Sequence, residues 1–166
     1  MNDFLDQVEA AANDGRLYYI ALLGALTVPD ICGALEAKDG QATGDRFKAW
    51  YDAHVAPQQK FLTGEDCYRF RCSFLHQGST QHPKSGYSRI LFVEPGAASN
   101  VVLHMNVMMD ALNIDARLFC LEVVDAARHW LTGVVGTEPY ETNLNAFVRR
   151  YPDGLPPYIG GVSVIS

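Results

Sequence analysis

The segment DCYRFRCSFLHQGS, residues 66–79, places two arginines and a histidine on a stretch that has the spacing of a helix. At about 100° per residue, Arg71 falls within the apolar arc, whereas Arg69, Ser73 and His76 fall on the other side. A guanidinium keeps its proton, so a buried Arg71 needs an anion and several hydrogen bonds. That anion is either a carboxylate of the same chain or a phosphate from outside.

An arginine and a histidine together suit chemistry at a phosphate. A histidine that titrates near neutral pH can accept a proton from an attacking group or protonate a leaving oxygen. An arginine can hold the phosphate and its growing negative charge. Arg71 and His76 are about 140° apart on one helix, so a single chain presents them poorly to one phosphate, and a dimer would remove this difficulty.

A salt bridge within the chain is the other explanation for Arg71. Asp30 is the obvious partner because it also lies in an apolar helical stretch, and Glu36 is a second choice. In this case the arginine is neutralised internally and His76 has no role in catalysis.

The surrounding sequence predicts a mainly α, single domain over residues 1–166. The run from Arg16 to Ala37 is apolar nearly all round, which predicts the central helix of a bundle, kinked or restarted at Pro29. Thr63 and Gly78 are plausible cap and stop residues for the helix that carries Arg71. Helices are expected over residues 4–14, 16–37, 45–55, 64–77, 115–132 and 138–151.

Two runs rich in β-branched residues, RILFVEP and NVVLHMNVM, interrupt this helical pattern. They predict one β-hairpin, inserted over about residues 88–109, with its turn at PGAAS, residues 95–99. The end of the chain, about residues 151–166, is rich in proline and glycine and predicts an irregular tail with a short strand-like VSVI.

RCSFLH, residues 71–76, fits the spacing R-x4-H and resembles the signature of HEPN domains, the higher eukaryotic and prokaryotic nucleotide-binding domains. The surrounding LTGEDCYRFRCSFLHQGSTQHPKS also resembles a group of uncharacterised bacterial proteins with HEPN-like helices. The resemblance covers about four helices. It implies a HEPN-like helical bundle in which the β-hairpin is an addition.

The resemblance also implies a function, namely RNA or nucleotide binding by a homodimer that needs no cofactor. Many HEPN proteins are metal-independent endoribonucleases of toxin or phage-defence systems, which implies catalytic roles for Arg71 and His76 and an antitoxin as a partner. R-x6-H is also a spacing of the family, so Arg69 is a second candidate arginine. Cys72 replaces the polar residue common in active members. A non-catalytic binding or scaffold module on the same fold is therefore the alternative.

Three further side chains are candidates for contacting the substrate. Arg69 and Ser73 precede His76 on its own helix, and Lys84 lies in the loop that follows. The net charge of −6 would repel nucleic acid as a whole, so any RNA must be held by such a local group of cations.

Composition favours a cytoplasmic protein without a membrane segment. Four cysteines without a disulfide-like pattern, and no signal-peptide-like start, indicate reduced thiols. The longest apolar run, Leu17 to Val28, is short for a bilayer. No phosphate-binding glycine loop supports a nucleotide cofactor. Zinc is not expected either, because the spacing of Cys67, Cys72, His76 and His82 does not match a zinc-binding pattern.

Overall fold

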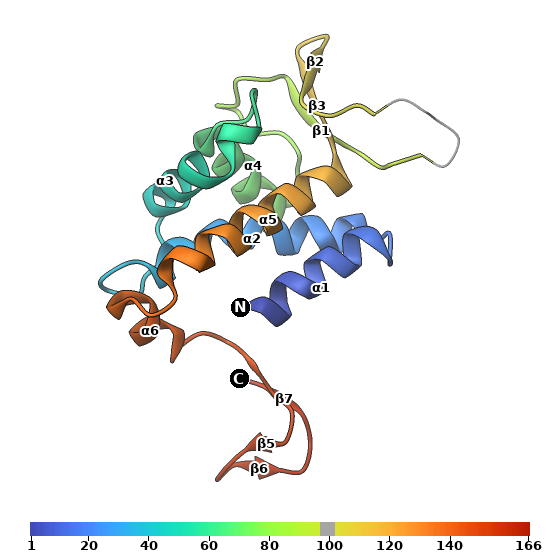
Figure 1. Cartoon of the computed structure of the whole chain (residues 1–166). Helices are drawn as coiled ribbons and strands as arrows, with labels where there is room; N and C mark the ends of the chain where they lie inside the picture. Colours follow the sequence, from blue (N-terminus) through green and yellow to red (C-terminus); the bar gives the residue numbers. More distant parts are fainter. Residues whose placement is uncertain (97–101) are drawn as a thin grey trace.

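Helices make up most of the chain in the computed structural model, which describes residues 1–96 and 102–166 (Figure 1). The mainly α fold class is therefore confirmed. Within the described residues the helices are α1 (Asn2–Asn13), α2 (Tyr18–Leu35), α3 (Gly44–His54), the short 3-10 helix η1 (Ala56–Gln58), α4 (Gly64–Gln77), α5 (Ala116–Val134) and α6 (Glu138–Leu144).

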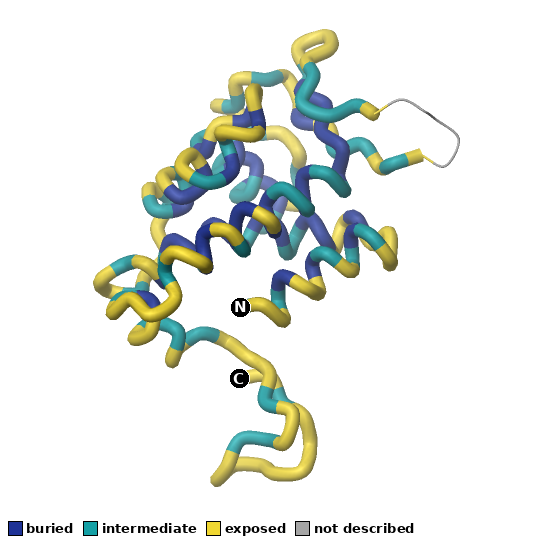
Figure 2. Tube along the Cα trace, viewed as in Figure 1, coloured by how far each residue is buried: buried dark blue, intermediate teal, exposed yellow. Residues whose placement is uncertain are grey.

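The central helix is α2, which packs against α1, α3 and α5. It runs through Pro29 as one continuous helix, because its neighbours hold the segment on several sides. By length and apolar composition α2 could cross a membrane, but 56% of it is buried inside the bundle, as expected for a core helix. Figure 2 shows buried residues concentrated on α2 and α5.

The bounds of α4 agree with those predicted from the sequence. At its start, the Thr63 hydroxyl accepts a hydrogen bond from the Asp66 amide at 3.1 Å. At its end, Gly78 adopts a left-handed conformation with φ of 63° and donates its amide to the Phe74 carbonyl. Two defined ends fix the position of the side chains between them.

The strands differ from the predicted hairpin over residues 88–109. Strand β1 (Arg89–Val93) pairs in parallel with β3 (Ala111–Asp115), and the hairpin joins β3 to β2 (Asn106–Met108) instead. The parallel register places Ile90 beside Leu112, and both side chains are buried. Burial of these apolar pairs favours β3 as the partner of β1. Part of the predicted turn at 95–99 lies outside the described residues.

The C-terminal tail projects from the bundle and is largely exposed (Figures 1 and 2). Helix α6 ends at Leu144, before the predicted limit at residue 151. The tail is less irregular than expected, because it forms two short antiparallel pairs. These are β4 (Arg150–Tyr151) with β7 (Val164–Ile165), and β5 (Gly154–Leu155) with β6 (Ile159–Gly160).

Candidate functional site

Arg71 on α4 forms an ion pair with Asp30 on α2. Its Nε donates to Asp30 Oδ2 at 2.8 Å, and its Nη2 lies 2.7 Å from the same oxygen. Both side chains are mostly covered, with exposed fractions of 20% for Arg71 and 14% for Asp30. The structure therefore shows the internal carboxylate that the sequence allowed. Glu36 has another partner and accepts a hydrogen bond from the Trp130 indole at 2.8 Å.

His76 lies beside the other edge of the same guanidinium. Arg71 Nη1 is 3.4 Å from His76 Nε2, within one chain. The expectation that the helical spacing separates these residues is wrong, because their long side chains meet despite the angle between their positions on the helix. His76 is exposed at the end of α4. A single protomer therefore presents an arginine edge and an imidazole at one surface.

The ion pair orients Arg71 without using all of its donors. Asp30 engages the Nε and Nη2 side, and Nη1 remains beside His76. Burial raises the pKa of Asp30, and the charge and hydrogen bond of Arg71 offset this effect only in part. The net positive charge at the surface is therefore lower than that of a free arginine. The ion pair also fixes the direction in which the guanidinium points.

The exposed side of α4 around this group is mostly apolar. Tyr68, Cys72 and Leu75 are half-buried and lie on the same outward side as Arg71. On α2, Ile20 has an exposed fraction of 57%. Arg71 thus lies among partly exposed, mostly apolar side chains of α4.

Arg69 holds the loop that follows α4. Its Nη1 donates to the Lys84 carbonyl at 2.5 Å, and its Nη2 lies 2.9 Å from Glu65. Asp66 accepts the Gly86 amide at 3.3 Å, which adds a second link to this loop. The Lys84 side chain itself is exposed. Arg69 therefore has structural partners, while Lys84 is free to contact a ligand at the surface.

Ser73 is buried rather than exposed, with an exposed fraction of 1%. Its assignment to the polar side of the helix is therefore wrong, because α4 also buries this side against the rest of the fold. A buried hydroxyl cannot contact a substrate from outside in this arrangement. Ser73 is therefore not a candidate contact. The residues that the structure brings together at the site are Arg71, His76 and Asp30.

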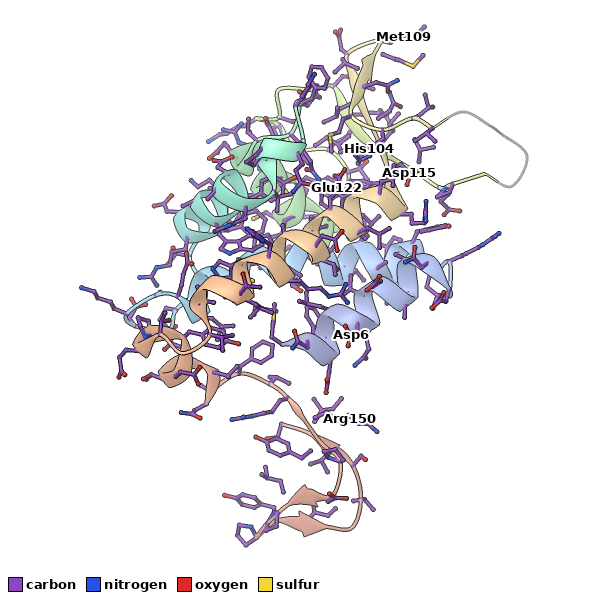
Figure 3. The ribbon with its side chains drawn as sticks, in the orientation of Figure 1. Asp6, His104, Met109, Asp115, Glu122 and Arg150 are labelled. Carbon is purple, nitrogen blue, oxygen red and sulfur yellow. The ribbon has the colours of Figure 1, made fainter. Side chains whose placement is uncertain are left out.

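A second polar cluster joins α5 to residues distant in sequence, and no motif or spacing in the sequence indicates it. Glu122 accepts a hydrogen bond from Gln59 at 2.7 Å and lies 3.0 Å from His104 Nε2. Gln59 in turn accepts from the Tyr51 hydroxyl. Figure 3 shows His104 and Glu122 side by side above α5. Gln59 is almost fully buried, so its hydrogen bonds satisfy polar groups of the core, while the buried His104 Nδ1 has no partner among the described residues.

Metal ligands do not gather among the described residues, where no group of three or more His, Cys, Asp or Glu side chains could hold a metal ion. The four cysteines are free, and Cys32, Cys67 and Cys120 are buried. No protein-family model, curated protein or solved structure matches this chain. The fold and site thus define a mainly helical protein with a surface arginine–histidine pair held by a carboxylate.

Proposed function

We propose that the protein is a HEPN-like, cytoplasmic, homodimeric protein that binds RNA or nucleotides through Arg71 and His76. The observation that supports it best is the distance of 3.4 Å between Arg71 Nη1 and His76 Nε2 at the surface of α4. Two nitrogen groups at this spacing can both contact the oxygens of one phosphate. The carboxylate of Asp30 holds the arginine in place for this contact.

The apolar surface around the pair supports the homodimer. Ile20 is exposed and Leu75 is partly exposed, and their burial against a second copy would be favourable. Such a contact would place two copies of the Arg71–His76 pair on either side of one interface.

Metal-independent RNA cleavage is a second candidate function, with a toxin or phage-defence role and an antitoxin partner. The exposed His76 imidazole beside an arginine donor favours it, because one group can transfer a proton while the other stabilises charge. The engagement of Arg71 by Asp30 and the presence of Cys72 favour binding without cleavage, or a scaffold role. We therefore place binding first.

The test measures both activities on the same variants. His76→Ala and Arg71→Lys are compared with wild type and with Lys60→Ala, an exposed cation outside the site. Arg71→Lys keeps a charge beside Asp30 but loses the planar group of donors. We expect both site variants to bind single-stranded RNA about tenfold more weakly and Lys60→Ala to bind like wild type.

Equal binding by all four proteins would contradict the proposal. Cleavage is measured with the same RNA in EDTA. Loss of cleavage in the His76 variant alone would support the nuclease candidate. Equal residual cleavage in all variants would remove it.

A further inference from the structure

A pocket of about 250 Å³ lies where α1 ends and where α2 and α5 begin. Asn13 is the last residue of α1, Tyr18 is the first residue of α2, and Arg117 is the second residue of α5. All three line the pocket, so three helix ends meet there. The other described residues of the lining are Arg16, Pro95 and Gly96. Two arginines from distant parts of the chain thus share one pocket.

These two arginines lack a carboxylate partner. Other arginines of the bundle pair with acidic side chains, as Arg71 does with Asp30 and Arg128 does with Asp6. Within the described residues, neither Arg16 nor Arg117 forms an ion pair, and no acidic residue lines the pocket. The chain has 19 acidic residues against 13 basic ones, so carboxylates are not scarce. The positive charge of this pocket is therefore left for an anion from outside.

Two guanidinium groups at one pocket repel each other unless an anion lies between them. Each supplies several N–H donors and no acceptor, so the matching ligand must be rich in acceptor oxygens. Arg117 is half-buried, and its Nη1 donates to Asn13 Oδ1 at 3.3 Å. This bond ties the guanidinium to the end of α1 and leaves its other donors for a ligand. One of the two cationic groups is thus positioned before any anion binds.

Arg16 occupies its place at an energetic cost. Its φ of 48° lies in the left-handed region, where a side chain crowds the backbone. Glycine adopts this conformation without that strain. The short connection from α1 to α2 therefore carries an arginine where local stability favours glycine, which indicates that the side chain contributes something other than the stability of the turn.

We infer that this pocket binds a phosphate monoester, with Arg16 and Arg117 as the groups that contact its oxygens. A monoester carries a charge of about −1.5 to −2 at pH 7, which two guanidinium groups balance. A carboxylate or an internal phosphodiester carries a single charge and leaves one guanidinium without a counter-charge. The inference does not rest on the proposed function, because Arg71 and His76 lie outside this pocket.

Amide chemical shifts of the wild-type chain locate the site. Inorganic phosphate is titrated at pH 7.5 and constant ionic strength, with chloride as the replacing anion. We expect the amide signals of Arg16, Leu17 and Arg117 to shift along one saturable curve. The absence of a saturable shift at these residues, or an equal shift with chloride alone, would overturn the inference.

Removal of one charge at a time tests the two arginines. Arg16→Gln and Arg117→Gln are compared with Arg89→Gln, in which an exposed arginine outside the pocket receives the same change. We expect each pocket variant to bind phosphate about tenfold more weakly, as for the loss of one charged hydrogen bond, and the control to bind like wild type. Unchanged affinity in a folded pocket variant would contradict the inference. Arg71→Lys should leave these signals and their titration curve unchanged, whatever its effect on RNA binding.

Arg16→Gly gives a readout that a merely structural arginine would not produce. Glycine relieves the left-handed strain, so the urea midpoint of unfolding should rise while phosphate affinity falls about tenfold. A variant that keeps its phosphate affinity would remove Arg16 from the site. A variant that loses both stability and affinity would give Arg16 a structural role and contradict the inference.

Two forms of one short RNA separate the sources of the monoester. One carries a 5′-phosphate and the other a 5′-hydroxyl group. If only the 5′-phosphate form shifts the pocket signals, the pocket takes the end of an RNA. If inorganic phosphate alone shifts them, its ligand is a small phosphate ester. Equal shifts with both RNAs would show recognition of internal phosphates and overturn the preference for a monoester.

Discussion

Asp30 and Arg71 are 41 residues apart in the chain, yet one carboxylate oxygen contacts both Nε and Nη2 of the guanidinium. The contact joins the central helix α2 to α4, which carries the candidate site. It also leaves Nη1 beside His76. From the sequence, a salt bridge within the chain and a contact with an outside phosphate were alternative explanations for Arg71. In the structure, Arg71 has an internal carboxylate partner and also a donor edge that faces outward.

Removing the carboxylate tests how much the ion pair stabilises the fold. Asp30→Ala leaves a partly buried guanidinium without its anion, which costs about 3–5 kcal/mol for a fully buried pair. Because Arg71 is 20% exposed, we expect a smaller loss of unfolding free energy, about 1–3 kcal/mol, in urea denaturation. Asp39→Ala removes the exposed pair with Arg46 and should change stability little. Full stability of Asp30→Ala would show that the pair is not structural.

The pH dependence of stability should have opposite signs at two aspartates. Burial, with only a partial offset from Arg71, raises the pKa of Asp30 above its ordinary value of 3.8. The folded chain therefore binds a proton at Asp30 more tightly than the unfolded chain does. The resulting contribution to stability is fully present below the unfolded pKa and is lost as pH rises through the folded pKa. We expect the stability of wild type relative to Asp30→Asn to increase as pH falls from 7 to 3.5.

Asp39 is the control for this measurement. Its hydrogen bond with Arg46 lowers its pKa, so its contribution is present above the unfolded pKa and is lost as pH falls through the folded one. The stability of wild type relative to Asp39→Asn should therefore decrease on acidification below about pH 4. The same sign for both aspartates would show that Arg71 outweighs burial at Asp30.

Two glycines should respond in opposite directions to alanine. A Cβ on Gly64, at the start of α4, would lie 2.5 Å from the Lys48 carbonyl oxygen, so backbone must shift. A Cβ on Gly133 in α5 meets nothing within 4 Å. We expect Gly133→Ala to raise the unfolding free energy by about 0.4–1 kcal/mol, and Gly64→Ala to lower it by more than that amount. Thermal denaturation of both variants measures these stability changes. A Gly64→Ala variant that is more stable than wild type would contradict the expectation.

Thiol labelling should distinguish Cys72 from the other three cysteines. Burial raises the pKa of Cys120 to about 12 and also raises the pKa of Cys32 and Cys67, so none of these three is a thiolate at pH 8. We expect one rapidly labelled thiol per native chain with a disulfide reagent, absent in Cys72→Ser, and four in urea. Rapid labelling of two or more native thiols would contradict the burial seen here.

The sequence predicted the helices well because their signals are local. The cap at Thr63, the left-handed Gly78 and the apolar faces of α2 and α5 lie within a few residues of the positions they determine. The pairing of β1 with β3 was missed because it depends on which of several apolar segments is buried beside Ile90. Local periodicity contains no information about that choice.

The candidate site was predicted in part for the same reason. The partner of Arg71 could be found because Asp30 is an unusual charge in an apolar helix. The closeness of Arg71 and His76 depends on side-chain conformation, and the burial of Ser73 depends on tertiary contacts around α4. Neither feature can be predicted from the angular spacing of residues around a helix. The pocket at Arg117 joins segments more than 100 residues apart, so no local pattern indicated it.

The parallel pairing of β1 with β3 has a consequence for the order of assembly during translation. When β1 leaves the ribosome, its partner strand β3 is still inside the ribosome, because Ala111 follows Arg89 in the chain. Helices α1 to α4 precede both strands and can associate earlier. The nascent chain thus passes through a stage in which the apolar strand β1 is unpaired.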